Sequence, residues 1–398
     1  MKNFQVINLG CKVNAVESAN FVAGLLAKGY EQGNLEDCEL VIVNTCTVTS
    51  VADKKSRKAV RHALKHSKGQ VFVTGCSSKI DAQVFEDMDA RVKVCPKAEL
   101  LKKLNDAERL RQGPEFKTRV GIKIQDGCDN ACTYCLVRHA RGRSTSLPFD
   151  KVLAEAKRYI DAGVRELVLS GINIGAYNYQ GKDLADLLAE LCKIPCEEPY
   201  RFRISSIEPQ DVSDAVIKAV KSSEGKICKH FHLPLQSGSS KVLHEMNRKY
   251  TAEEFQALVD KIYTQMPDFS ISTDIIVCFP GETEEDFQKT LELAKACRFS
   301  KIHVFPYSKR QGTPAASRKD QIEDGIKAKR VKELSALGDK LRAENFKKRS
   351  GSPELCLVQE DGKALTESYF EITAPKDAEV GQLVKAPVIS TEDQRSWS

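Results

Sequence analysis

Three cysteines fall within one short stretch of the sequence, QDGCDNACTYCLVRHARG at residues 125–142. Cys128, Cys132 and Cys135 are separated by three and by two residues. In a long chain without secretory features, thiols clustered in this way favour metal ligation over disulfide bonds. An iron–sulfur cubane normally takes four cysteine thiolates, so three would leave one iron open to a small molecule. A zinc ion completed by His139 is the alternative, although this spacing matches none of the familiar zinc signatures.

A second set of three cysteines is distributed over three expected strands near the N-terminus. Cys11, Cys46 and Cys76 each stand just past an apolar run, in the strings LGC, NTC and TGC. In a parallel sheet the carboxyl ends of the strands face one rim, where α/β proteins bind ligands. We therefore expect these thiols to converge and to form a second metal site, again with an open fourth position. The competing interpretation is three buried cysteines, because cysteine is among the residues most often buried.

The other cysteines and two histidines carry weaker signals. His230 and His232 alternate within one expected strand, so we expect them to face opposite ways and to serve in packing or at the solvent-exposed surface, not as metal ligands. Eight cysteines lack the placement described above and are expected to be small packing residues: Cys38, Cys95, Cys192, Cys196, Cys228, Cys278, Cys297 and Cys356.

The elements that must position these residues predict an α/β protein of three parts. Residues 1–105 alternate apolar strands with helices, which is typical of a small doubly wound parallel sheet. A polar stretch with Gly-Pro at 106–118 is expected to be a linker. Residues 350–398 contain short strands separated by turn residues, which predicts a small all-β module.

The central part, residues 119–349, is expected to be a partial barrel followed by a long charged helix at about 320–349. Strands alternate there with amphipathic helices, and a full barrel would require eight strands. Only six strands are expected, at 119–125, 165–171, 200–206, 229–235, 269–277 and 301–307. The first of them runs directly into the stretch with the three clustered cysteines.

Length, composition and charge narrow the class of protein. A chain of 398 residues suggests two or three domains. The N-terminus lacks a secretory signal and no apolar run is long enough to span a membrane, so we expect a cytoplasmic protein without membrane contact. Residues 53–68 carry seven Lys or Arg against one Asp, and 318–349 are also net basic. Residues 350–398 are net acidic, with four Lys or Arg against nine acids.

Several strings, taken with the cysteines, resemble one known family. DGCDNACTYC after the first strand of a β/α series looks like the signature of radical S-adenosylmethionine enzymes. Together with LGCKVN, NTCTVT, TGC, HLPLQSGS, RKYT and TDIIVCFPGETEEDF, it resembles the methylthiotransferases over essentially the whole chain. The strings LGCKVNAVES, NTCTVTSVADKKSR and HVFPYSKRQGTPAA look most like the branch that modifies threonylcarbamoyladenosine at position 37 of tRNA. The resemblance implies a radical-enzyme partial barrel of six β/α units and a C-terminal module similar to TRAM, an RNA-binding appendage.

The resemblance also implies cofactors and roles for individual residues. Two [4Fe–4S] clusters would be held, one on Cys128, Cys132 and Cys135 and the other on Cys11, Cys46 and Cys76. The catalytic cluster, on the first triad, would bind S-adenosylmethionine and generate the 5′-deoxyadenosyl radical that abstracts hydrogen from C2 of the adenine. The second cluster would carry the sulfur, and a second S-adenosylmethionine would supply the methyl group. Candidate contacts to S-adenosylmethionine are Tyr134, Ser170, Gly171, Ser206, Gln236 and Ser237.

The implied partners are a tRNA anticodon loop as substrate, a reductant such as flavodoxin or ferredoxin, and a sulfur donor. The acidic C-terminal module departs from this pattern, because tRNA affinity depends largely on Lys and Arg. Cys278 is a second departure, since the family usually has glycine there. Within the family, isopentenyladenosine in tRNA and an aspartate of a small-subunit ribosomal protein are alternative substrates. A non-enzymatic iron–sulfur electron carrier or scaffold is the remaining alternative, although such proteins usually complete their ligand sets.

Overall fold

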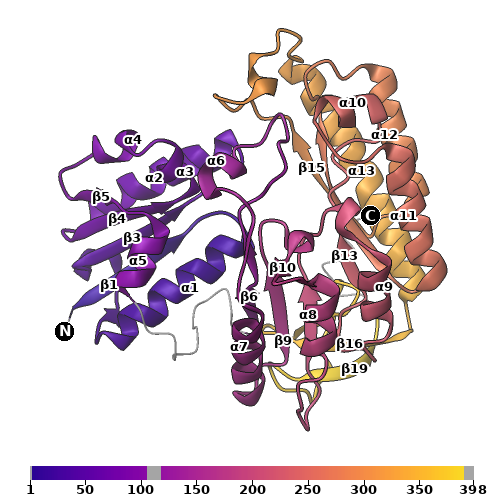
Figure 1. Ribbon diagram of the computed structural model, residues 1–398, viewed down its shortest axis with the longest axis horizontal. Coiled ribbons are helices and arrows are strands. Elements are labelled where there is room, and N and C mark those ends of the chain that lie inside the picture. The colour runs from indigo at the N-terminus through magenta and orange to yellow at the C-terminus, as the bar shows by residue number, and fades with distance from the viewer. Residues whose placement is uncertain (1, 105–117, 390–398) are drawn as a thin grey trace.

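The computed structural model describes residues 2–104 and 118–389, and it contains three groups of strands (Figure 1). A parallel sheet lies at the N-terminal end, a curved set of parallel strands forms the centre, and an antiparallel sheet follows at the C-terminal end. The expected α/β class is therefore confirmed. The expected linker at 106–118 lies, except for its last residue, outside the described residues.

The N-terminal sheet has the strand order β2-β1-β3-β4-β5, and every pair in it is parallel. The central strands are buried nearly throughout because helices cover both faces of the sheet. One apolar cluster joins α1 and α5 to the sheet, and another joins α2 to the opposite face. The strands are β1 (Asn3–Asn8), β2 (Glu31–Gln32), β3 (Leu40–Thr45), β4 (Gln70–Gly75) and β5 (Val92–Val94). The helices are α1 (Lys12–Ala27), α2 (Ser50–His66), α3 (Cys76–Ile80), α4 (Gln83–Glu86) and α5 (Lys97–Lys103).

The central part contains the six expected parallel strands, in two sheets ordered β6-β9-β12 and β13-β14-β15. A bridge between Ser206 and His232 joins the two sheets, so the strands follow one another as an open barrel. The strands are β6 (Arg119–Lys123), β9 (Glu166–Ser170), β12 (Arg201–Ile204), β13 (His230–His232), β14 (Ser270–Val277) and β15 (Lys301–Pro306). Short pairs are β7 (Gln125–Asp126) with β8 (Thr145–Ser146) and β10 (Asn178–Tyr179) with β11 (Lys182–Asp183).

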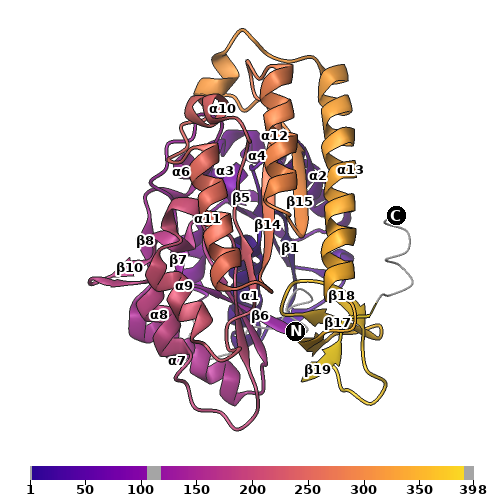
Figure 2. The ribbon, with the colours of Figure 1, turned by 90° about the vertical axis from the view of Figure 1, so that its right-hand side faces the viewer.

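Helices cover the outside of this barrel, and a long terminal helix lies along β15 (Figure 2). The expected charged helix begins at Asp324, slightly later than about residue 320. The helices are α6 (Val137–Arg141), α7 (Phe149–Asp161), α8 (Leu184–Leu191), α9 (Asp214–Lys221), α10 (Ser240–Glu245), α11 (Ala252–Gln265), α12 (Glu284–Ala296) and α13 (Asp324–Arg349). No helix of the described residues has the length and apolar character needed to cross a bilayer.

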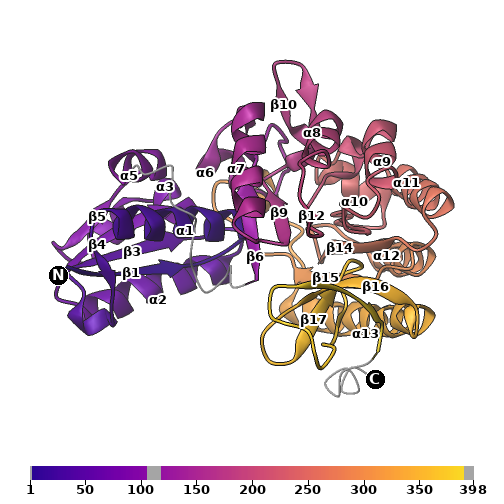
Figure 3. The same cartoon turned by 90° about the horizontal axis from the view of Figure 1, so that it is seen from below.

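The C-terminal strands form an antiparallel sheet, the β module, that packs under the barrel (Figure 3). Its strands are β16 (Pro353–Val358), β17 (Lys363–Thr366), β18 (Glu371–Thr373) and β19 (Leu383–Pro387), in the order β18-β17-β16-β19. Two fully buried barrel arginines hold it: Arg201 donates to the carbonyls of Leu355 (2.5 Å) and Leu365 (2.9 Å), and Arg203 to those of Thr366 (3.0 Å) and Glu367 (3.1 Å).

The two arginines are neutralised by one buried carboxylate, Glu166, which accepts from Arg201 Nε (2.7 Å) and from Arg203 Nε (2.8 Å). Burial raises the pKa of Glu166, but the charges of Arg203 and Arg201 outweigh it and hold that pKa below its ordinary value. The ion cluster therefore forms the floor of the barrel, and the β module closes it from below.

Candidate active site between two cysteine triads

The first cysteine triad lies on the loop that connects β7 to α6, at the carboxyl end of the barrel's first strand. The loop is fixed by neighbouring backbone: Cys128 N donates to Gly142 O (3.1 Å), and Thr133 N donates to Met246 O (3.1 Å). Arg248 Nη1 lies 3.4 Å from Cys132 Sγ and pairs with Glu208 across the barrel mouth. The segment 245–248 thus determines where the thiols point.

The three thiols of this triad share one environment. Burial, together with the neighbouring Cys132 and Cys128 thiols, raises the pKa of Cys135 to about 12, because like charges oppose one another. Burial likewise raises the pKa of Cys128, again with a contribution from Cys132. Thiols that oppose one another's ionisation in this way are stabilised as thiolates by a bound cationic centre.

The second triad is brought together by the N-terminal sheet as expected. Cys11 is the N-cap residue of α1, Cys46 follows β3, and Cys76 is the first residue of α3 directly after β4. Burial raises the pKa of Cys46, and both Cys11 and Cys76 contribute to the rise, which places the three thiols close together. Cys11 is exposed, so the interpretation as three buried cysteines is wrong.

A charged cluster from α6 connects the two triads. Arg141 Nε lies 3.3 Å from Cys76 Sγ, although Arg141 belongs to the helix that follows the first triad. Its guanidinium also bonds Glu17 of α1 (3.0 Å) and Asp126 of β7 (2.8 Å). Burial raises the pKa of Glu17, but Lys97, Arg141 and Lys123 outweigh it and hold that pKa below its ordinary value. The cluster therefore joins the N-terminal sheet rigidly to the barrel mouth.

A cavity of about 170 Å³ lies beside the first triad and the segment that follows Cys46. One wall is the segment Thr47–Thr49 directly after Cys46, and the opposite wall is Tyr134–Val137, which includes Cys135. The barrel contributes the remaining lining residues: Gln236, Asp274, Ile276 and Phe305–Ser308. A larger cavity of about 300 Å³ lies between the barrel and the β module and contains no cysteine. Of these two cavities, the smaller one borders both Cys135 of the first triad and the segment that follows Cys46 of the second.

Two family models match the sequence: the radical SAM superfamily over residues 122–294, and the uncharacterized protein family UPF0004 over residues 3–95. Threonylcarbamoyladenosine tRNA methylthiotransferase MtaB of Bacillus subtilis is 39% identical over 84% of this chain and 80% of its own length. The protein of the same name from Aquifex aeolicus is 36% identical over 95% of this chain and 98% of its own. The chain belongs to the radical S-adenosylmethionine methylthiotransferase family.

Methylthiotransferases with a different named substrate also match. The tRNA-2-methylthio-N(6)-dimethylallyladenosine synthase of Carboxydothermus hydrogenoformans is 34% identical over 92% of this chain and 89% of its own length. Among solved structures, the radical S-adenosylmethionine methyltransferase TsrM of Kitasatospora setae, with cobalamin and a [4Fe–4S] cluster bound, aligns with a TM-score of 0.56. It covers 79% of this chain and 77% of its own at 12% identity, which shows a shared fold. The interpretation as an electron carrier or scaffold is therefore set aside.

Methylthiotransferases of this family use two [4Fe–4S] clusters and S-adenosylmethionine, and the residues of this chain fit them. Each triad offers three thiols and leaves the fourth position to a small molecule. The zinc alternative does not fit: His139 is exposed, and no metal-ligand group within 4.8 Å in the described chain contains a cysteine. Sulfurs around a single zinc ion would lie within that distance. When bound, the first cluster supplies the electron that cleaves the sulfonium of S-adenosylmethionine.

The residues expected to contact S-adenosylmethionine differ in where they lie. Tyr134 and Gln236 line the cavity. Ser206 is half-buried at the joint between the two barrel sheets. Ser237 is fully buried and contacts Thr290 Oγ1 at 3.5 Å, which turns its hydroxyl away from the cavity and toward α12. A role of Ser237 toward the cofactor is therefore not supported.

The remaining candidates, Ser170 and Gly171, lie where β9 ends beside Gln125. Ser170 is buried and its hydroxyl donates to Val168 O (3.3 Å). Gln125 Oε1 accepts from the backbone N–H groups of Ile172 (3.0 Å) and Asn173 (2.8 Å). A Cβ at position 171 would lie 2.7 Å from Ile174 Cγ2 and 3.0 Å from Gln125 Oε1, so the glycine permits this close approach. The role of Gln125 was not predicted from the sequence. The one sequence feature that indicates it is its position at the end of the first expected barrel strand.

The expectation that His230 and His232 face opposite ways was wrong. Residues two apart on a strand point to the same side, and both rings bond the same hydroxyl: His230 Nε2 lies 2.8 Å and His232 Nδ1 2.9 Å from Ser272 Oγ. Both therefore face the barrel interior. Among the expected packing cysteines, six are buried and Cys192 is half-buried, whereas Cys196 is exposed and bonded by Arg165 (3.5 Å). Packing was the wrong assignment for Cys196.

The wall formed by Thr47–Thr49 is clamped to the barrel. Arg310, in the loop after β15, pairs with Asp53 of α2 and donates to Thr47 Oγ1 (2.5 Å). The backbone N–H of Ser50 donates to Ser308 Oγ (3.0 Å). Because both contacts border the cavity, the methylthiotransferase holds the segment after Cys46 at a set distance from the first triad.

Proposed function

We propose that the protein converts N6-threonylcarbamoyladenosine in tRNA to its 2-methylthio derivative. The observation that carries this proposal is the cavity bounded on one side by Cys135 and on the other by the segment after Cys46. An adenine held there would have a radical source on one side and a sulfur source on the other. The named activity of the Bacillus subtilis and Aquifex aeolicus relatives supports the choice of substrate.

The roles follow from this placement. Cys128, Cys132 and Cys135 would ligate the cluster that binds S-adenosylmethionine, and Cys11, Cys46 and Cys76 the cluster that delivers sulfur. Tyr134 and Gln236 would contact the cofactor from the cavity wall. A flavodoxin- or ferredoxin-type reductant and a separate sulfur donor complete the reaction. A tRNA substrate would place the enzyme in the cytoplasm.

The tRNA would reach the cavity along α2. This helix begins at Ser50, beside the clamp to the barrel. It exposes a row of cations, Lys54, Lys55, Lys58, Arg61 and Lys65, and Lys68 is exposed just past its end. Phosphate contacts of this kind supply most tRNA affinity without reading sequence. The anticodon-loop base would be unstacked and inserted into the cavity, where Phe305 offers a partly exposed ring for stacking.

The substrate assignment is tested in the organism itself. Deletion of the gene is expected to remove 2-methylthio-threonylcarbamoyladenosine from tRNA and to leave threonylcarbamoyladenosine in its place. Mass spectrometry of tRNA nucleosides measures both. A plasmid copy of the wild-type gene should restore the modification. If that nucleoside persists while 2-methylthio-isopentenyladenosine or the ribosomal aspartate modification is lost, the proposed substrate is wrong.

The second cluster makes a separate prediction at Gly10, which precedes Cys11. Its φ is +103°, and a Cβ placed there would lie 2.6 Å from Cys46 Sγ. Gly10→Ala is therefore expected to displace that thiol and to lower reconstituted iron from about eight to about four per chain. Gly29→Ala is the matched control, because φ is +80° there and nothing lies within 4 Å of the added carbon. Equal iron in Gly10→Ala and wild type would contradict the assignment of Cys46.

A further inference from the structure

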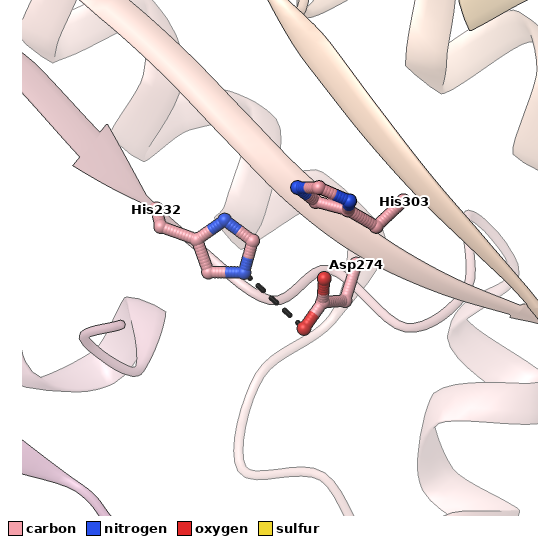
Figure 4. Close-up of side chains that lie close together, drawn as sticks. All are labelled: His232, Asp274 and His303. Atoms are coloured by element: carbon pink, nitrogen blue, oxygen red, sulfur yellow. Dashed lines mark ion pairs between the residues drawn. The ribbon is translucent and has the colours of Figure 1, made fainter. Parts of the chain in front are cut away.

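A polar group without an assigned role lies inside the barrel, just below the cavity. His232 of β13, Asp274 of β14 and His303 of β15 bring their polar atoms within 4.8 Å of one another (Figure 4). His232 Nε2 lies 3.2 Å from Asp274 Oδ2, and Asp274 itself lines the cavity. The group is thus within reach of a substituent attached to a base that occupies the cavity.

Hydrogen bonding within this group is incomplete on one side. His232 is held at both ring nitrogens, by Ser272 Oγ and by Asp274. Neither ring nitrogen of His303 bonds another described residue, and its one ring contact is with His232, at 5.7 Å between centroids. Asp274 keeps Oδ1 available as an acceptor, since His232 is bound at Oδ2. The group therefore offers a free donor, His303, beside a free acceptor, Asp274.

Lys12 brings a positive charge to the same place from the N-terminal sheet. It follows Cys11 directly, and its Nζ lies 5.6 Å from the ring centroid of Tyr369. Within residues 2–104 and 118–389 it has no carboxylate partner. By contrast, Lys97 and Lys123 at the other side of α1 are both paired with Glu17.

The charge of Lys12 contributes to the pKa shifts of three neighbouring groups. Burial lowers the pKa of His303; Asp274 opposes this shift, whereas His232, Lys301 and Lys12 lower the pKa further. Burial also lowers the pKa of His230, with additional contributions from Arg203, His232 and Lys12. Burial raises the pKa of Tyr369, but Lys12 and nearby arginines outweigh it and leave that pKa below its ordinary value. Apart from Asp274, the charges that act on these three groups are therefore mainly cationic.

The cations around this group favour an anion over a metal ion. Two histidines and one carboxylate are a familiar ligand set for a divalent metal. The unpaired ammonium of Lys12 beside Tyr369 opposes a cation in this part of the barrel, whereas it attracts a carboxylate. A free carboxylate, a hydroxyl and urea N–H groups are the polar parts of a threonylcarbamoyl substituent.

We propose that Lys12 and His303 bind the carboxylate of the threonylcarbamoyl group, while Asp274 accepts a hydrogen bond from its hydroxyl or urea N–H. This inference rests on the proposed function. An isopentenyl substituent would leave Lys12 and the Asp274 acceptor desolvated and unpaired, which disfavours it. These residues would therefore select an acidic N6-substituent over an apolar one.

The test is a binding cycle on the reconstituted holoenzyme. Three anticodon stem–loop RNAs are compared, carrying threonylcarbamoyladenosine, its methyl ester, or isopentenyladenosine at the target position. Fluorescence anisotropy under anaerobic conditions gives each Kd. Lys12→Gln is expected to weaken binding of the free acid at least about tenfold and binding of the ester less than about twofold, because only the acid offers a charge-assisted bond. His303→Gln is expected to show the same difference more weakly.

Lys28→Gln is the matched control, since Lys28 is exposed at the opposite end of α1 and should change neither Kd. Iron content verifies that Lys12→Gln keeps both clusters, and His303→Gln serves as the test if it does not. Equal weakening of acid and ester in both variants, or no weakening of either, would overturn the inference. Failure of the proposed function would look different: the wild-type enzyme itself would prefer the isopentenyl RNA and leave the acid unmodified.

Discussion

Cys46→Ala is expected to leave S-adenosylmethionine cleavage measurable while sulfur insertion into the tRNA is abolished, whereas Cys128→Ala abolishes both. The two thiols belong to different triads: Cys46 follows β3 and Cys128 precedes α6, and one cavity borders both Cys135 and the segment after Cys46. Each three-thiol set has no protein ligand to spare, so removal of one thiol should destabilise its own cluster. The measurement is 5′-deoxyadenosine release and 2-methylthio product, both quantified by mass spectrometry after anaerobic reduction.

Cys95→Ala provides the matched control for this pair. Cys95 lies just past the carboxyl end of β5, on the same rim of the same sheet, but it is buried and belongs to an apolar cluster with α1 and α5. Its replacement should leave both products unchanged apart from a modest loss of stability. If Cys46→Ala and Cys128→Ala lose cleavage to the same extent, the proposed division of labour between the triads is incorrect.

Glu166→Ala is expected to lower the free energy of unfolding by about 3–5 kcal/mol, because it leaves two buried guanidinium groups without their counter-charge. Arg201 and Arg203 are both fully buried, and both pair with this one carboxylate. The midpoint of urea-induced unfolding measures the loss. Earlier protease cleavage in the segment between α13 and β16 should accompany it, because the same arginines hold the β module.

Glu190→Ala is the appropriate comparison, because Glu190 forms an exposed pair with Lys193 and such pairs contribute about 0–1 kcal/mol.

The low pKa of Glu166 also makes the contribution of this carboxylate to stability depend on pH. Its stabilisation is fully present above the unfolded-state pKa of about 4.3 and is lost only as pH falls through the lower folded value. Unfolding midpoints of Glu166→Ala and wild type that agree at neutral pH would show that the cluster does not support the floor.

The strands and the cysteine positions could be predicted because apolar runs and strand ends are local features. β3, for example, is buried almost throughout, and Cys46 directly follows its last residue, Thr45. Strands with little apolar character were missed: β2 is the pair Glu31–Gln32, and β17 spans four residues. Neither segment carries the alternation that indicates a strand.

The charged contacts around the site could not be read from the sequence. Arg141 reaches Cys76 across 65 positions, and Arg248 reaches Cys132 across 116, so no local pattern reports either contact. Cys278, where the family usually has glycine, has a φ of +60° and a buried side chain. The backbone there keeps the conformation that glycine favours, and the thiol is accommodated in the core.

The way the β module is held has a consequence for how the protein can evolve. Arg201 and Arg203 bond four carbonyl oxygens of the module's main chain, and every residue type supplies such an oxygen. These bonds do not depend on the module's side chains. The surface residues of the module can therefore change, even to the net acidity seen here, without weakening its attachment to the barrel. A C-terminal module from another methylthiotransferase should be exchangeable onto this barrel, and RNA preference could then diverge independently of the catalytic chemistry.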